Sequence, residues 1–544
     1  MDTALLALAL GALAFYGIYD ALTVSFTQFI QPLVAGVVTG AIMGNLEVGM
    51  IVGGTLQLAA LGLYTYGGAS IPDFMSAAML AVVFAIEGNI SPLTAVALSL
   101  PIAVFLIQLD VLARTINTAF IHMADRAVEE GKFNRIPIIS WFGLFPWGFS
   151  RFIPVFIGVY YGKTIATYID TVIPHYINNG FITVGQVLPV VGLTLLLTFL
   201  PTRKYIPFLI IGYFFAAYLA IPVLGITLIV FAIALIYFDL KGENILALLS
   251  RKKETVSTTS ATSAVSGAGS AGTAAGAAYV TQRDLNWLFV KQLFHFQVSW
   301  NYERMQALDY LYNITHILKK IYKKPEELKE AYKTHLNFYN TNPNTHCFIQ
   351  GMDVALEDKE GPSSLPTVTG IKAGLMGPLA GVGDAVFYTT LDVIVLAVGA
   401  SLVLSGIWEG MLLAVGYGLF VLVPVRYYFI KQGYNSAMGL AASTTTETLN
   451  KVTEFVGAVG LAIIGALIFL YVPIHTPISY TTVVSGVKHV VVVQNLLNTI
   501  FPGLIPVAFA GTAYFLYTKK FSILKVLLII FVIAWVLGAL GWLI

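Results

Sequence analysis

Two glycine-rich segments of this chain carry a carboxylate inside apolar sequence, one in each half. The first runs from Gly53 to Asp73, and the second runs from Gly370 to Asp384. Lipid tolerates neither an interrupted helix nor a bare carboxylate unless protein or a water-filled cavity surrounds it. Glycine-interrupted apolar segments in both halves of a chain are also typical of the binding sites of membrane carriers. The pattern therefore predicts a membrane carrier with a polar pocket near the middle of the bilayer.

The remaining sequence also favours a polytopic, all-α membrane protein. Of its 544 residues, 57% are hydrophobic and 11% are charged, whereas soluble domains contain roughly 25% charged residues. One crossing needs about 20 apolar residues, so the span 205–238 is long enough for a hairpin that turns near Pro222. The other predicted spans lie near residues 4–24, 33–62, 76–108, 138–162, 181–200, 373–404, 408–430, 456–473, 498–517 and 521–544.

Helix breakers interrupt the first 87 residues and the second glycine-rich segment. Pro32, Gly53-Gly54, Gly67-Gly68 and Pro72 recur within the first region, which has almost no charged surface. We therefore expect broken or re-entrant helices there rather than a set of regular crossings. In the second half we expect a re-entrant tip that presents Asp384.

Basic residues predict the orientation of the chain in its membrane. The charged loop Ala124–Arg135, the pair Arg203-Lys204 and the cluster Arg251–Lys253 should face the cytoplasm, because cytoplasmic loops carry an excess of Lys and Arg. Lys519-Lys520 should face the same side, which would leave the C-terminus outside.

Residues 255–278 contain only Thr, Val, Ser, Ala and Gly, which is the composition of a flexible linker. This linker follows one basic cluster and precedes a charged segment, so we expect it in the cytoplasm. Pro325, followed by two glutamates, predicts the start of a solvated helix beyond it. The predicted organisation is a membrane unit at 1–250, a linker region at 251–280 and a second unit at 281–544. Within the second unit we expect cytoplasmic or interfacial helices at 281–369 and a membrane part at 370–544.

The polar residues of the first glycine-rich segment have the chemistry of a sugar site. Thr55, Gln57, Tyr64, Thr65 and Asp73 offer hydroxyl, amide, carboxylate and aromatic groups. Sugar hydroxyls need paired donors and acceptors, and sugar C–H faces pack on rings. The alternative is that the glycines pack helices together while the polar residues satisfy broken backbone. Composition alone leaves both interpretations open.

Phe296–Leu311 has an amphipathic pattern that is typical of a helix lying at the membrane surface. A functional interpretation instead places Asn301 and Glu303 at a substrate gate.

Other classes of chemistry have little support in the sequence. Cys347 is the single cysteine, so neither an intrachain disulfide nor a cysteine-based metal site is possible within one chain. The eight histidines are scattered, without HExxH or triad spacing, and the GxGD of the second segment lacks the Lys-Ser/Thr of a nucleotide loop. We predict no metal, no cofactor, no nucleic-acid partner and no enzymatic activity of the chain itself.

The order and number of several motifs resemble one bacterial transport family. The first half is similar to the enzyme IIC subunit of the mannose/fructose/sorbose class of the phosphoenolpyruvate-dependent phosphotransferase system, through FTQFIQPLVAGVVTG, GNLEVGMIVGGTLQLAALG, Pro72-Asp73 and Arg114–Gly131. The second half is similar to the matching IID subunit, through Ser299–Tyr310, His335–Pro343, Gly370–Asp384, Arg426–Tyr434 and Phe501–Val507.

The resemblance implies a hexose permease that works with a cytoplasmic IIAB partner, which carries phosphohistidine and phosphorylates the sugar during uptake. It also implies a trimer of IIC–IID pairs, two related folds of opposite membrane orientation, and an elevator movement. The substrate-binding residues that it implies are Gln28, Gln57, Thr65 and Asp73 in the first half and Asn301, Glu303 and Asp384 in the second.

Three positions depart from the family pattern. Gln57 stands where glutamate is frequent, Thr65 where asparagine is familiar, and Asp392 where some IID relatives have arginine. Sites built for particular hydrogen bonds reject mismatched ligands, so the substrate need not be mannose. The alternative function is an ion-coupled secondary transporter that uses Asp73 and Asp384 as proton or sodium sites.

Overall fold

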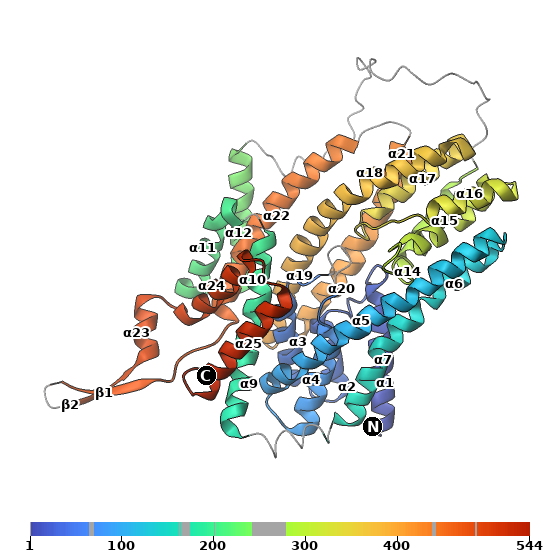
Figure 1. Cartoon of the computed structure of the whole chain (residues 1–544). Coiled ribbons are helices and arrows are strands. Elements are labelled where there is room, and N and C mark those ends of the chain that lie inside the picture. Colours follow the sequence, from blue (N-terminus) through green and yellow to red (C-terminus); the bar gives the residue numbers. More distant parts are fainter. Residues whose placement is uncertain are drawn as a thin grey trace.

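The computed structural model describes residues 2–64, 70–162, 164, 174–200, 202–241, 279–437, 442–484 and 487–544. Its elements are almost entirely helical, which confirms the predicted all-α class (Figure 1). The first half forms α1 (Thr3–Ala21), α2 (Pro32–Ile42), α3 (Leu46–Ala60), α4 (Phe74–Gly88), α5 (Pro92–Glu129), η2 (Phe133–Arg135), α6 (Ile136–Phe142), α7 (Leu144–Tyr160), α9 (His175–Val187), α10 (Pro189–Phe199), α11 (Thr202–Leu219) and α12 (Val223–Leu240).

The second half contains helices of three kinds and one β-hairpin. The hairpin pairs β1 (Ser479–Val484) with β2 (Val487–Val492) in antiparallel register. The helices are α14 (Gln282–Phe294), α15 (Ala307–Ile321), α16 (Pro325–His335), α17 (His346–Glu360), η3 (Gly361–Ser364), α18 (Leu365–Gly383), the π-helical segment η4 (Asp384–Asp392), α19 (Val393–Leu404), η5 (Trp408–Gly410), α20 (Met411–Tyr417), the π-helical segment η6 (Gly418–Leu422), α21 (Val423–Ser436), α22 (Ala442–Leu470), α23 (Val493–Ile500), α24 (Leu504–Thr518) and α25 (Ile523–Ala539).

Several of these helices are long and apolar enough to cross a membrane. Within the described ranges there are five such spans, or six if the bent pair α23 and α24 counts as one. The shorter helices α2, α3 and α4 have 11, 15 and 15 residues. Each is shorter than the roughly 20 residues of a full crossing. The expected interruption is therefore confirmed for α2 to α4. Helix α1 is instead long enough for a regular crossing, and Gly53-Gly54 lie within α3 without breaking it.

Local breaker signals explain where two predicted spans divide. The hairpin near Pro222 is confirmed, because α11 ends at Leu219 and α12 begins at Val223. The single span at 76–108 is wrong, because Asn89 takes a left-handed conformation (φ 50°) and ends α4. The Ser91 hydroxyl then accepts a hydrogen bond from the Thr94 N–H and caps α5.

Two expectations for the second half are also wrong, whereas a third is confirmed. Asp384 does not lie at a re-entrant tip, because α18, η4 and α19 follow one another without a break. Phe296–Leu311 is not one amphipathic helix: α15 begins only at Ala307, and Asn301 pairs with Met305 in an isolated bridge before it. The helix predicted to begin at Pro325 is α16.

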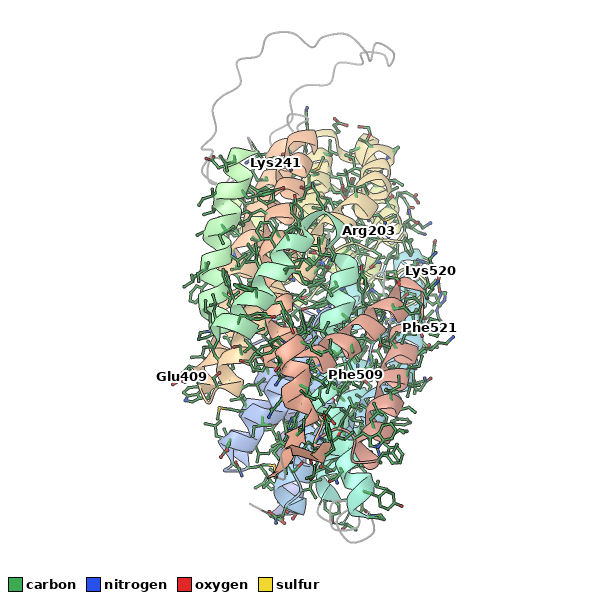
Figure 2. The ribbon with its side chains drawn as sticks, turned by 90° about the vertical axis from the view of Figure 1, so that its left-hand side faces the viewer. Arg203, Lys241, Glu409, Phe509, Lys520 and Phe521 are labelled. Carbon is green, nitrogen blue, oxygen red and sulfur yellow. The ribbon has the colours of Figure 1, made fainter. Side chains whose placement is uncertain are left out.

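The two halves of the chain share one apolar core. Helix α25 packs against α9, α11 against α22, and α3 against α19. Figure 1 shows the C-terminal helices among those of the first half. Lys204 and Lys241, from α11 and the end of α12, both contact the Glu454 carboxylate of α22, at 2.5 and 4.0 Å. Figure 2 places Arg203 and Lys241 in the upper part of the molecule, well above Glu409. The predicted linker 255–278 lies outside the described residues.

Candidate substrate site

A cavity of about 280 Å³ lies between the two halves of the chain. Three of the predicted site residues line it: Gln28, Asp73 and Asp384. Both halves contribute polar and aromatic groups to its wall, and these include Gln31, Tyr64, Asp110, Arg114, Trp147, Arg151, Trp300, Gln306, Asn344, Tyr388, Asp392, Tyr417 and Arg426. A mostly concave surface with a few convergent polar groups is the usual form of a small-molecule site.

Asp73 belongs to a buried network of four charges. The Arg151 guanidinium donates hydrogen bonds to Asp73 Oδ2 at 2.6 Å and to Asp110 Oδ1 at 2.9 Å. The Arg114 Nε atom lies 2.8 Å from Asp110 Oδ2, one helical turn along α5. The Asp73 carboxylate also caps α4 by accepting a hydrogen bond from the Ser76 N–H. Two cations thus balance two anions, which is what burial of charge requires.

The turn between α1 and α2 presents a row of amides to the cavity. Asp20 holds this turn, because its carboxylate accepts hydrogen bonds from the Ser25 hydroxyl and the Phe29 N–H. Gln28 takes a left-handed conformation (φ 52°) within the turn and lines the cavity. Gln57 does not line the cavity; its amide instead donates to Gln31 Oε1 at 3.2 Å. Gln57 therefore lies behind Gln31, which the sequence interpretation missed.

The π-helical segment η4 brings two further carboxylates to the cavity wall. Asp384 begins the segment and accepts a hydrogen bond from the Asn342 amide at 2.8 Å. Asp392 ends the segment, and one of its oxygens accepts a hydrogen bond from the Tyr64 hydroxyl. Neither carboxylate forms an ion pair with any described residue. Segments of π-helix are frequent at functional sites, because the extra residue displaces side chains from the regular α-helical pattern.

Asn301 and Glu303 do not line the cavity, but they shape the loop that does. The Asn301 carboxamide oxygen accepts hydrogen bonds from the N–H groups of Glu303 and Arg304, which closes a tight turn. The Glu303 carboxylate lies 2.8 Å from His122 of α5. Arg304 donates two hydrogen bonds to the Asp125 carboxylate, and this pairing raises the pKa of the guanidinium. The loop is thus fixed to the first half of the chain.

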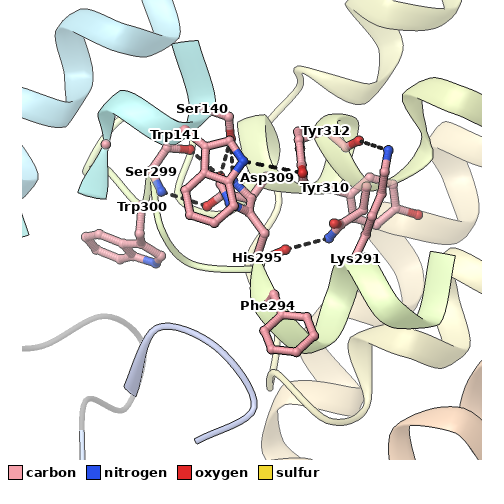
Figure 3. A network of polar contacts seen from close by, with 12 residues as sticks. Ser140, Trp141, Lys291, Phe294, His295, Ser299, Trp300, Asp309, Tyr310 and Tyr312 are labelled. Atoms are coloured by element: carbon pink, nitrogen blue, oxygen red, sulfur yellow. Dashed lines mark hydrogen bonds and ion pairs between the residues drawn. The ribbon is translucent and has the colours of Figure 1, made fainter. Parts of the chain in front are cut away.

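A buried polar network fixes the same loop from its other side (Figure 3). The Asp309 carboxylate accepts hydrogen bonds from the Ser299 N–H at 2.8 Å and from the Ser140 hydroxyl at 2.6 Å. The ring of His295 lies 2.7 Å from the same Ser140 oxygen. These side chains are at most 1% exposed. Their arrangement therefore supports the fold, and it orients Trp300 toward the cavity from the adjoining position.

The prediction for Thr65 falls outside the described residues. Arg151 lines the cavity although it is not among the predicted site residues, and the sequence marks Asp392 only as a departure from the family pattern. Arg151 had a usable signal, since an ionisable residue within an apolar span is by default a candidate functional residue.

Comparison with known proteins identifies the two halves separately. Residues 279–543 match the family model of the mannose/fructose/sorbose family IID component of the phosphotransferase system, and residues 4–236 match that of the sorbose-specific IIC component. The mannose-specific EIID component of Escherichia coli K12 is 34% identical over 260 residues, which cover 47% of this chain and 92% of that relative. The sorbose-specific EIIC component of Klebsiella pneumoniae is 32% identical over 214 residues, 39% of this chain and 80% of that relative.

One similar solved structure is described as the mannose transporter ManYZ in complex with microcin E492. Its matching chain is 34% identical in sequence, and the match covers 48% of this chain and 98% of that one, with a TM-score of 0.28. The family matches follow one another along the sequence, IIC first and IID second. The chain therefore belongs to the mannose/fructose/sorbose family of phosphotransferase-system permeases, with a IIC component and a IID component joined in one polypeptide.

Proposed function

We propose that this permease translocates a hexose across the bacterial cytoplasmic membrane and that a separate IIAB protein, carrying phosphohistidine, phosphorylates the sugar during uptake. One observation carries the proposal: the cavity between the IIC and IID units presents amides, carboxylates, guanidinium groups and indole rings to one small volume. Hydroxyls need such donors and acceptors, and the C–H face of a sugar packs on aromatic rings. The relatives are described as mannose-specific and sorbose-specific components, which agrees with a hexose.

The proposed roles follow from the geometry of the wall. Gln28 and Asp384 exchange hydrogen bonds with hydroxyls, while Trp147 and Trp300 receive the apolar face of the ring. Asp73 orients Arg151, and Gln57 orients Gln31, so both act through a neighbour. We assign Asn301 and Glu303 to the shape and gating of the pocket, and Thr65 keeps the substrate-binding role that the resemblance implies.

The assembly that we propose is a homotrimer of this fused chain that transports by an elevator movement. In it, residues 1–250 form the IIC unit, 281–544 form the IID unit, and the linker 255–278 lies in the cytoplasm. We assign the phosphoryl-transfer chemistry to the IIAB partner, as the resemblance to the permease components of this family implies.

Uptake into right-side-out vesicles tests the proposal. Vesicles loaded with phosphoenolpyruvate and the soluble phosphotransferase proteins should accumulate labelled hexose as sugar phosphate. Omission of the IIAB protein should abolish that accumulation. Free sugar accumulating on an ion gradient alone would contradict the proposal and favour the ion-coupled alternative. The relatives named above are all phosphotransferase components, so the comparisons give that alternative no support.

A further inference from the structure

Asp392 carries a buried acceptor that the fold leaves unused. Its side chain lines the cavity and is 4% exposed. The Oδ2 atom accepts a hydrogen bond from the Tyr64 hydroxyl, whereas Oδ1 has no hydrogen-bond partner within the described part of the chain. Buried polar atoms are nearly always paired, and Asp392 is an unpaired case on a residue that lines the cavity. Its Oδ1 atom has less than 1 Å² of accessible surface, so a turn of the side chain toward the cavity must expose it to a partner.

The surroundings of Asp392 combine an acceptor with an aromatic surface. Tyr64 comes from the IIC unit, and its ring stacks on Tyr388 of the IID unit with 5.0 Å between centroids and 9° between planes. All three side chains line the same cavity. Among the described residues no cation pairs with Asp392, so its side chain favours a hydroxyl group over an anion as its partner.

We propose that Asp392 is a substrate-binding residue of the IID unit, and that its Oδ1 atom accepts a hydrogen bond from one hydroxyl of the bound hexose. This inference rests on the proposed function, because it takes the cavity to be the hexose site. Tyr64 holds the carboxylate in place from the IIC unit, so the contact forms only where the two units meet. Hydrogen bonds to a carboxylate are about twice as strong as neutral ones, which makes Asp392 a determinant of hexose selectivity.

The chain contains a matched control for this carboxylate. Asp353 on α17 has the same local arrangement: Oδ2 accepts a hydrogen bond from the Tyr310 hydroxyl, and Oδ1 is buried without a partner. Asp353 does not line the cavity. Asp353→Asn therefore imposes the same chemical change on a tyrosine–aspartate pair without touching the proposed site.

The experiment measures sugar binding to the purified full-length chain in nanodiscs by quenching of tryptophan fluorescence, since Trp147 and Trp300 line the cavity. D-mannose, D-fructose, L-sorbose and D-glucosamine are tried first, and the monodeoxy series of the tightest ligand follows. Asp392→Asn should weaken that ligand about tenfold or more. One deoxy sugar lacks the hydroxyl that Asp392 binds. It should bind the wild type weakly, and Asp392→Asn should not weaken its binding further. Asp353→Asn should leave every affinity unchanged.

Three other results would overturn the inference. If Asp392→Asn binds the parent hexose as tightly as the wild type, Asp392 does not contact the sugar. If Asp392→Asn weakens the binding of every deoxy sugar by the same factor, the effect is structural. The effect is also structural if Asp353→Asn weakens the binding of these sugars in the same way. If the wild type binds none of these sugars, the proposed function fails as well. If Asp392→Asn is poorly folded, Tyr64→Phe is measured with the same sugars. This variant keeps both Asp392 oxygens and removes only the hydroxyl that holds the carboxylate in place.

Discussion

Arg151 is the residue on which the IIC part of the cavity wall depends. It is 5% exposed and bridges Asp73 and Asp110, so removal of either carboxylate leaves a buried cation short of a partner. We expect Asp73→Asn to destabilise the purified protein by up to about 3–5 kcal/mol, and the double variant Asp73→Asn with Arg151→Gln to recover part of that loss. Thermal unfolding followed by tryptophan fluorescence measures both.

Glu303→Gln serves as the comparison, because Glu303 is part of a partly exposed pair that should contribute less than about 1 kcal/mol. A melting temperature of Asp73→Asn equal to that of Glu303→Gln would show that Arg151 does not need the Asp73 charge.

Individual site residues were predictable where the sequence itself sets them apart. Asp73 and Asp384 stand out as carboxylates within apolar segments, and both reach the cavity. Asn301 and Glu303 do not reach the cavity, because contacts with residues more than 150 positions away fix their loop in another orientation. No local pattern encodes such contacts. The same holds for Tyr64 and Asp392, which meet only because α3 packs against α19.

At the level of elements, α2 and α3 pack through two facing pairs of glycines. A Cβ atom on Gly36 would lie 2.6 Å from Gly53 Cα, and one on Gly40 would lie 2.6 Å from Gly49 Cα. Small residues four apart allow such close helix contact in membranes. Gly36→Ala should therefore destabilise the protein by about 1–3 kcal/mol through overpacking, measured as a lower melting temperature.

Gly374 on α18 is the matched control, since a Cβ atom there would meet nothing within 4 Å. Gly374→Ala should be neutral or stabilising by up to about 1 kcal/mol, because alanine is a better helix former. Equal melting temperatures for the two variants would contradict the packing role of Gly36.

Helix boundaries followed the sequence where a cap or a proline marks them. The starts of α12 and α16 were predicted from Pro222 and Pro325, and the packing role considered for the first glycine-rich segment holds at Gly53. Hydropathy alone does not show the break at Asn89, because apolar residues continue on both sides of it, although Ser91 and Pro92 mark the next helix start. Continuity through Asp384 could not be predicted, because the glycines and the π-helical turn are accommodated within an unbroken helix.

For the whole molecule, the contacts between the two halves should make the covalent linker dispensable. Arg304 pairs with Asp125 across the junction, Ser140 bonds to Asp309, and one apolar core includes helices of both halves. We predict that a chain cut at a protease site inserted within 255–278 stays together in detergent, as judged by gel filtration of the cleaved sample. Cleavage should occur in inverted vesicles and not in intact cells.

Separation of the two fragments would show that the linker holds the halves together, and cleavage in intact cells would reverse the predicted orientation. An uncut chain with the same inserted site provides the reference profile. The two-unit organisation was readable from the linker composition, whereas the shared core was not, because hydropathy gives no information on which spans touch.

The packing of α25 against α9 has a consequence for how the protein is made. About 350 residues separate the end of one helix from the end of the other. At a synthesis rate of roughly 5–20 residues per second, α9 waits some 20–70 s in the membrane before its neighbour leaves the ribosome. During that interval the early helices have lipid or an insertion factor on the face that α25 will later cover. Because both helices belong to one chain, α25 is always made after α9, in the same membrane and next to its partner.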